Sequence, residues 1–158
     1  SKSNSIFKVD KSVSKILKQE KKDGFLNPKK IKKYIKKLEI LKKNLDKKID
    51  KICLKKEKKI FAFGSSVSST SFFTYFNLTK KVDFIIDDNP LKQGMYHACG
   101  GIPIYPSSYL DKVKNYYGII FAWEHNSKII KNFSKFISKN TGFIELFPKI
   151  KIIDKNIN

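Results

Sequence analysis

The sequence predicts an α/β protein in which an N-terminal helical arm with one long helix precedes a mostly parallel sheet with flanking helices. Two observations support this fold class. Residues 1–57 repeat apolar side chains at helical spacing among many lysines, whereas residues 58–158 alternate short apolar, β-favouring segments with helical ones. We therefore expect two parts, a helical arm at 1–57 and an α/β domain at 58–158.

Two helices are expected in the arm. The first covers residues 11–23 and ends at Gly24, which readily adopts the left-handed conformation of a helix end. Its inward-facing residues are expected to be Val13, Ile16 and Leu17. Asn27 and Pro28 begin the second helix, because Asn caps a helix start and Pro suits its first turn.

The second helix carries one apolar stripe over about seven turns. Its members are Ile31, Tyr34, Ile35, Leu38, Leu41, Leu45, Ile49 and Ile52. Such a stripe is longer than a small sheet covers, which favours packing of one part on another domain or chain. The alternative is a helix that lies wholly against its own sheet, and the sequence leaves both open.

Composition excludes several classes of protein. No apolar run reaches the roughly 18 residues that span a bilayer, and no signal-peptide core is found, so we expect a cytoplasmic protein without a membrane span. Two cysteines and two histidines without a CxxC spacing predict no metal site. The formal charge is +20, with no arginine. Because base readout and bidentate phosphate binding favour arginine, a solvated lysine-rich surface is favoured over nucleic-acid or membrane binding, and no specific nucleic-acid partner is expected.

The first part of the α/β domain is predicted to be a right-handed, Rossmann-like βαβ unit. Its strands are residues 59–63 and 82–86, and Gly64 breaks the first. Ser65 and Ser66 are candidate caps for the helix between them. That helix and its end carry the apolar residues Val67, Phe72, Phe73, Phe76 and Leu78.

The remaining elements follow from the same patterns. A glycine- and proline-rich loop at 91–106 contains one short extended piece. The elements expected are that piece at 102–104, a brief helix through Leu110, a strand at 117–122, a helix at 127–139, a strand at 142–146 and a fifth strand at 150–153.

Polar or aromatic residues follow three of the predicted strands, at 64–66, 87–89 and 123–125. A helix N-terminus at Gly64, Ser65 and Ser66 favours an anion. Asp87, with Asp88 beside it, ends the second strand, where dinucleotide-binding folds place an acid on a ribose. The turn has one glycine instead of the full fingerprint, so an open sheet without a ligand there is the alternative to an NAD site. The carboxyl ends of parallel strands lie at one edge of their sheet, and we expect the loop that begins at Lys92 to fold over this edge. This edge predicts a site for a polar ligand with a flat ring, such as a nucleotide or nucleotide sugar.

Each candidate has a structural alternative. Asp87 and Asp88 accept hydrogen bonds from sugar hydroxyls or cap the turn, and Lys92 meets a phosphate or solvent. Tyr96 and Trp123 stack on a base or a sugar face, or pack in the core. His125 is a further candidate contact, but it adjoins Glu124 in sequence, and adjacent side chains seldom face each other. No catalytic residue is therefore expected.

The segment IDDNPLKQGMY at 86–96 is followed by GIPI at 101–104. This pair of motifs resembles the C-terminal domain of S-adenosylmethionine-dependent sugar C-methyltransferases and is the most specific part of the resemblance. Supporting matches are the turn at 63–66, the Ala-Trp pair at 122–123 and the helix, break and long helix of residues 13–52. The family turn commonly has Lys and Gly where Ser68 and Ser69 stand here, which removes a cation and a flexible position.

The resemblance implies a Rossmann-like domain that helps to hold a nucleotide-linked deoxysugar. It implies no cofactor in this chain, because S-adenosylmethionine and the catalytic base belong to a separate methyltransferase domain. The expected substrate contacts are Gly64, Ser65, Ser66, Asp87, Asp88, Lys92, Tyr96, Trp123 and His125. We expect a chain that positions the sugar and is inactive alone. The alternative is a stand-alone, non-catalytic module that binds a nucleotide, a nucleotide sugar or a partner.

Overall fold

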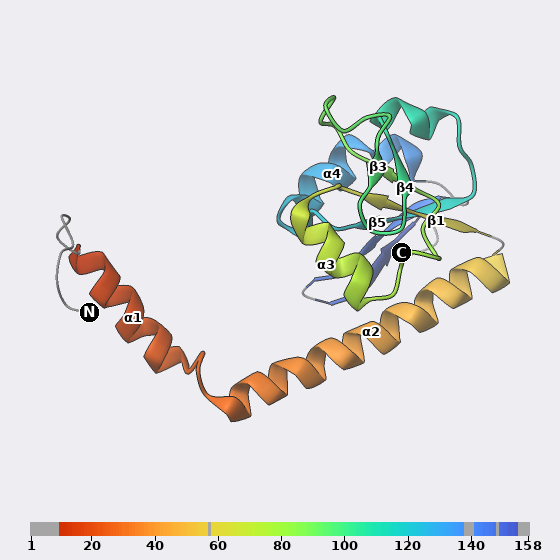
Figure 1. Cartoon of the computed structure of the whole chain (residues 1–158). Helices are drawn as coiled ribbons and strands as arrows, with labels where there is room; N and C mark the ends of the chain where they lie inside the picture. The colour runs from red at the N-terminus through yellow and green to blue at the C-terminus, as the bar shows by residue number, and fades with distance from the viewer. Residues whose placement is uncertain (1–9, 57, 138–140, 148, 155–158) are drawn as a thin grey trace. The chain divides into compact units, whose positions relative to one another are not determined.

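A computed structural model describes residues 10–56, 58–137, 141–147 and 149–154 (Figure 1). Contacts within the chain divide it into two compact units, which meet in sequence between Ile40 and Leu41. That division falls inside the long helix, and the domain boundary between residues 57 and 58 stays a prediction. None of the helices in the described part of the chain is both long enough and apolar enough to cross a membrane.

The first unit contains helix α1 (Lys11–Asp23) and the beginning of helix α2 (Pro28–Lys56). The Asp10 carboxylate caps α1 by accepting a 2.7 Å hydrogen bond from the Ser12 amide, and Gly24 ends it at φ 68°. The bounds of this helix confirm the prediction, but the prediction of its inward-facing residues is wrong. Val13, Ile16 and Leu17 are exposed, because no described element of this unit forms a layer over them.

The burial of the apolar residues of helix α2 differs along its length. Leu45, Ile49 and Ile52, in the second unit, are at most 1% exposed and belong to its core. The earlier members of the stripe are between 37% and 61% exposed, namely Ile31, Tyr34, Ile35 and Leu38. The exposed members belong to the first unit and the buried ones to the second, so both packing alternatives for the whole stripe stay open.

The second unit is built on a seven-stranded sheet with the order β3-β4-β2-β1-β5-β6-β7 (Figure 1). The strands are β1 (Lys59–Phe63), β2 (Phe84–Ile86), β3 (Tyr96–His97), β4 (Ile102–Tyr105), β5 (Tyr116–Ile120), β6 (Gly142–Glu145) and β7 (Lys151–Ile153). The five central strands are parallel, and only the edge strands β3 and β7 are antiparallel among those described. This arrangement confirms the predicted α/β, mostly parallel, Rossmann-like fold.

Helices cover both faces of the sheet. Side chains alternate along β1, so that Ile60 and Ala62 pack with α2 and α3 (Val67–Tyr75), whereas Phe61 and Phe63 face the opposite layer. That layer contains η1 (Ser107–Asp111), α4 (Asn126–Asn132) and η3 (Ser134–Phe136), and the short turn η2 (Trp123–His125) leads from β5 into α4. The sheet thus lies between two apolar cores, and its carboxyl edge stays available for a site.

Three local predictions are corrected. The helix predicted at 127–139 is shorter, because α4 ends at Asn132 and a 3-10 turn follows; residues 138–140 lie outside the described part. Val67 is 92% exposed, since it is the first residue after the cap of α3 and lies before the helix reaches the core. Strand β3 lies in the segment predicted as a loop, where it pairs with β4 at the sheet edge.

Candidate functional site

The turn between β1 and α3 is fixed by its own polar groups. Gly64 adopts φ 97°, a conformation that disfavours side chains, and its amide donates to the Ile86 carbonyl at 2.8 Å. Ser66 caps α3 in a reciprocal arrangement. The Ser69 amide donates to Ser66 Oγ at 3.2 Å, and the Ser66 amide donates to Ser69 Oγ at 3.0 Å. Of the two candidate caps, Ser66 therefore has that role.

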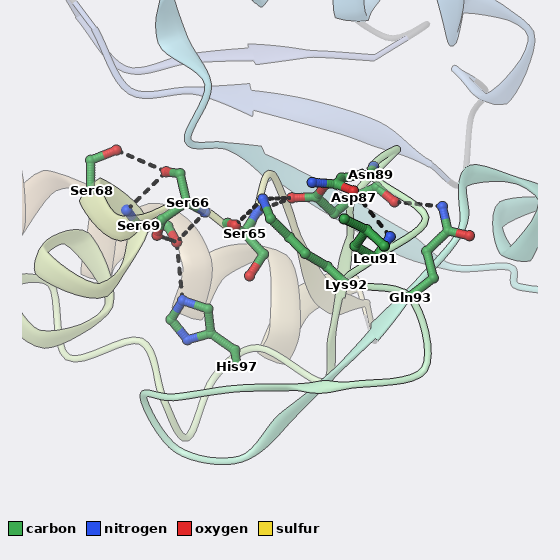
Figure 2. A network of polar contacts seen from close by, with 10 residues as sticks. All are labelled: Ser65, Ser66, Ser68, Ser69, Asp87, Asn89, Leu91, Lys92, Gln93 and His97. Carbon is green, nitrogen blue, oxygen red and sulfur yellow. Dashed lines mark hydrogen bonds and ion pairs between the residues drawn. The ribbon is translucent and has the colours of Figure 1, made fainter.

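Asp87 connects the ends of β1 and β2 (Figure 2). Its Oδ2 accepts hydrogen bonds from the Ser65 amide at 2.7 Å and from Lys92 Nζ at 3.0 Å, and its Oδ1 accepts one from the Asn89 amide at 2.9 Å. Lys92 Nζ also donates to the Ser65 carbonyl at 2.5 Å. These contacts give Asp87 and Lys92 structural roles at the turn, and their contact with a ligand stays a prediction.

A buried histidine, which sequence reasoning missed as a structural residue, holds the loop before β4 against α3 (Figure 2). His97 Nδ1 lies 3.2 Å from the Cys99 amide nitrogen, and its Nε2 forms a 3.0 Å hydrogen bond with Ser69 Oγ. The ring also packs on Phe73, with centroids 4.9 Å apart. A single histidine in a glycine-rich loop carries no periodic signal that would have predicted this contact.

A cavity of about 380 Å³, called cavity A below, lies at the carboxyl ends of β1, β2 and β5. It brings together six of the predicted contact residues: Gly64, Ser65, Ser66, Asp87, Asp88 and His125. Helix α4 adds Lys128 and Asn132, which the sequence pattern did not single out. In the sequence they look like any polar residues on the solvent side of a helix, so only the fold identifies them as lining residues.

Three predicted contacts lie outside cavity A. Lys92 is beside it, bonded to Asp87. Tyr96 is 72% exposed on the edge strand β3. Trp123 lines a second cavity, of about 580 Å³, called cavity B below. The loop from Lys92 contacts the ends of β1 and β2 through that lysine, and none of the described lining of cavity A comes from residues 92–101.

Cavity A offers hydrogen bonding and charge beside an apolar wall, which consists of Phe63, Ala122, Ile129 and Phe133. Ser65 and Ser66 supply hydroxyls, and α3 begins here, so its partial positive charge favours an anion. Lys128 adds an ammonium group, and Asp88 adds a carboxylate. Among the residues that the structure describes, no three His, Cys, Asp or Glu side chains gather in a way that would hold a metal ion.

Comparisons with known proteins place the chain in a family. A search of curated proteins gives no match. Among solved structures, the chain is similar to the UDP-D-quinovosamine 4-dehydrogenase from Vibrio fischeri, with 15% identity and a TM-score of 0.44 over 63% of this chain and 95% of that one. The family described as the C-methyltransferase C-terminal domain matches residues 1–148, nearly the whole chain. The chain therefore belongs to the C-methyltransferase C-terminal domain family.

Proposed function

We propose that this chain is the part of a sugar C-methyltransferase that binds the nucleotide sugar and orients it for methyl transfer. The observation that supports this role is cavity A, where parallel strands and the start of α3 gather hydroxyl, ammonium and carboxylate groups at one edge. The family supplies the link to methyl transfer. Holding the reacting carbon in one orientation is a large contribution to such a reaction, without any proton transfer by this chain.

Each group in cavity A has a proposed partner on the ligand. The diphosphate lies near Ser66 at the start of α3 and near Lys128, because both favour negative charge. Asp88 accepts hydrogen bonds from hydroxyl groups, and His125 donates or accepts one. Asp87 acts indirectly, since its carboxylate already accepts three hydrogen bonds that fix the turn.

Methyl transfer requires S-adenosylmethionine, and we propose that a separate domain holds it. When bound there, it supplies the electrophilic methyl group. Two features of this chain support the assignment. First, Asp87 stands where dinucleotide-binding folds place the ribose-binding acid, but its carboxylate already accepts hydrogen bonds from the turn. Second, the turn after β1 has only one glycine, so a ligand can approach its backbone closely at only one position. We accordingly propose that the chain alone has no methyltransferase activity.

The exposed half of the apolar stripe on α2 is the proposed contact with that catalytic domain. Ile31, Tyr34, Ile35 and Leu38 form one face at helical spacing. Their exposure in this chain and the family's link to a methyltransferase support the assignment. The domain belongs to the same or to another polypeptide.

The test is a thermal-shift screen of the chain with nucleoside diphosphates, their sugars and S-adenosylmethionine. A ligand at 100 times its Kd stabilises the folded chain by about 2.7 kcal/mol, which raises Tm visibly. We expect a rise with a nucleotide sugar and none with S-adenosylmethionine. Lys128→Gln should weaken binding about tenfold, because it removes a charged contact to phosphate.

Lys131→Gln is the matched control. Lys131 is also an exposed lysine of α4 but does not line cavity A, so its loss should leave Kd within about twofold. Equal weakening by both variants would indicate a general effect of charge and would count against cavity A. If no nucleotide or nucleotide sugar raised Tm, the proposed function would be wrong and the interaction-module alternative would gain support.

A further inference from the structure

Cavity B lies beside the carboxyl ends of β5 and β6 and has aromatic walls. Phe72 of α3, Trp123 of η2 and Phe147 after β6 line it. The rings form one continuous surface, because the centroid of Phe147 is 5.7 Å from that of Phe72 and 6.4 Å from that of Trp123. Trp123 is 49% exposed, so much of its surface is available to a ligand.

Charged groups of opposite sign lie at the same cavity. Glu145 ends β6 and Lys151 begins β7, directly opposite it in the antiparallel pair. Their side chains approach to 4.0 Å between Oε2 and Nζ, and the Glu145 side chain is only 14% exposed. An acceptor and a donor are therefore presented side by side next to an aromatic surface.

Asn126 adds a polar group that lacks a partner. It lines cavity B and is 9% exposed, and its Oδ1 has no hydrogen-bond partner among the described residues. A buried amide oxygen without a hydrogen bond destabilises the fold, because it has lost its contacts with water. A ligand donor in the cavity would remove that cost once the amide turns toward it.

Cavities A and B are lined by neighbouring residues of one segment. His125 and Lys128 line cavity A, and Trp123, Asn126 and Ser127 line cavity B. The two cavities therefore lie on either side of one short segment, η2 and the start of α4.

We propose that cavity B binds the base of the nucleotide sugar. This inference rests on the proposed function and adds a base-binding site to it. A nucleobase has flat faces that stack on aromatic rings, and its edge carries a donor and an acceptor next to each other. Those are the features of the aromatic wall and of the Glu145–Lys151 pair. A purely apolar ligand would leave both charges desolvated, which disfavours it.

The test uses Trp123, which is the only tryptophan of the chain. Its fluorescence, excited at the red edge of its absorption band where nucleosides absorb weakly, is followed during titration with nucleosides, nucleoside diphosphates and inorganic pyrophosphate. We expect saturable quenching by the nucleoside diphosphate of the preferred base and by its nucleoside at higher concentration. Pyrophosphate, which lacks a base, should leave the emission unchanged.

Variants assign the quenching to cavity B. Calorimetry should show about tenfold weaker nucleotide binding for Trp123→Ala, because base stacking is lost. Glu145→Gln should weaken it to a similar extent by removing a charged acceptor. Trp123→Phe keeps an aromatic wall and should bind within about threefold of the original chain. Phe25→Ala, which removes an exposed aromatic from the other compact unit, is the matched control and should bind unchanged.

The outcomes separate this inference from the proposed function. Nucleotide-sugar binding that Lys128→Gln weakens, while Trp123→Ala and Glu145→Gln leave it intact, would overturn the inference and keep the proposed function. Saturable quenching by a nucleoside, without tighter binding of any nucleotide sugar, would support a base site in cavity B and oppose the proposed function. No binding of any nucleoside or nucleotide would overturn both.

Discussion

The two halves of α2 have the same pattern and different environments. Ile31 and Ile35 in the first half and Ile49 and Ile52 in the second belong to one stripe of one helix. The first two are 42% and 50% exposed, and the last two are 1% exposed. Helical periodicity therefore predicts which face is apolar, whereas burial depends on what the rest of the chain brings against that face.

Polar contacts differ between the halves in the same way. In the second half, Asp46 and Asp50 form ion pairs with Lys81 at 3.0 Å and 3.5 Å. In the first half, Lys37 lies over the Tyr34 ring of the same helix, 5.6 Å from its centroid. The second half is thus tied to the segment before β2 by charge as well as by apolar packing.

The largest expected effect comes from truncating the stripe at matched positions. Ile49→Ala should lower the free energy of unfolding by about 2–5 kcal/mol, because it leaves a cavity in a packed core. Ile35→Ala should cost less than about 1 kcal/mol, since its side chain is half exposed. Urea unfolding of both variants measures the difference. Equal losses would show that the first half is packed within the chain, and the comparison would fail.

A smaller effect is expected when the ion pairs of the second half are removed. Lys81→Met should destabilise the chain by about 1 kcal/mol at neutral pH, as partly exposed pairs do. Lys37→Met, in the first half, should change stability by less than about 0.5 kcal/mol. Thermal or urea unfolding measures both. If Lys37→Met cost as much as Lys81→Met, charge would not distinguish the two halves.

The pH dependence of Lys81 sharpens this prediction. Burial acts to lower the pKa of its ammonium group, but the contacts with Asp46 and Asp50 outweigh burial and raise that pKa above 10.5. A raised pKa in the folded state gives stability that is fully present below the ordinary lysine pKa and is lost as the pH rises through the raised one. The difference between the original chain and Lys81→Met should therefore be constant at neutral pH and shrink only in strongly alkaline solution.

Most of the fold follows from the sequence, because the pattern itself encodes the elements. Gly64 and the Ser66 cap mark the start of α3, and Asp87 marks the end of β2, so the βαβ unit was predictable from local chemistry. The short strand β3 was not. It is stabilised by pairing with β4 across a glycine-rich loop, and two residues are too few to show a period.

The candidate site was predictable only up to the shared edge of the sheet. The strand ends that carry Gly64 and Asp87 do meet at cavity A, as parallel strands require. The sequence did not reveal that Trp123 lines a different cavity from His125, two residues away. That separation depends on the direction in which each side chain leaves the turn η2, which residue type and spacing do not specify.

Adding charge to the exposed half of α2 is also expected to have only a small effect on stability. Ile35→Glu combined with Leu38→Glu should change the free energy of unfolding by less than about 1 kcal/mol, because both side chains are solvent-accessible and Glu is a good helix former. Urea unfolding measures this change, and Lys36→Gln with Lys37→Gln, on the same turns, is the control, because it shifts the net charge by the same two units. A loss specific to the Ile35 and Leu38 variant would show that something covers this face in solution. Sedimentation would then identify the cover, since a second copy would make the loss depend on protein concentration. An unchanged stability leaves the face open to the catalytic domain that we propose as its partner, and the same two substitutions should weaken that binding, because they place charge in an apolar contact.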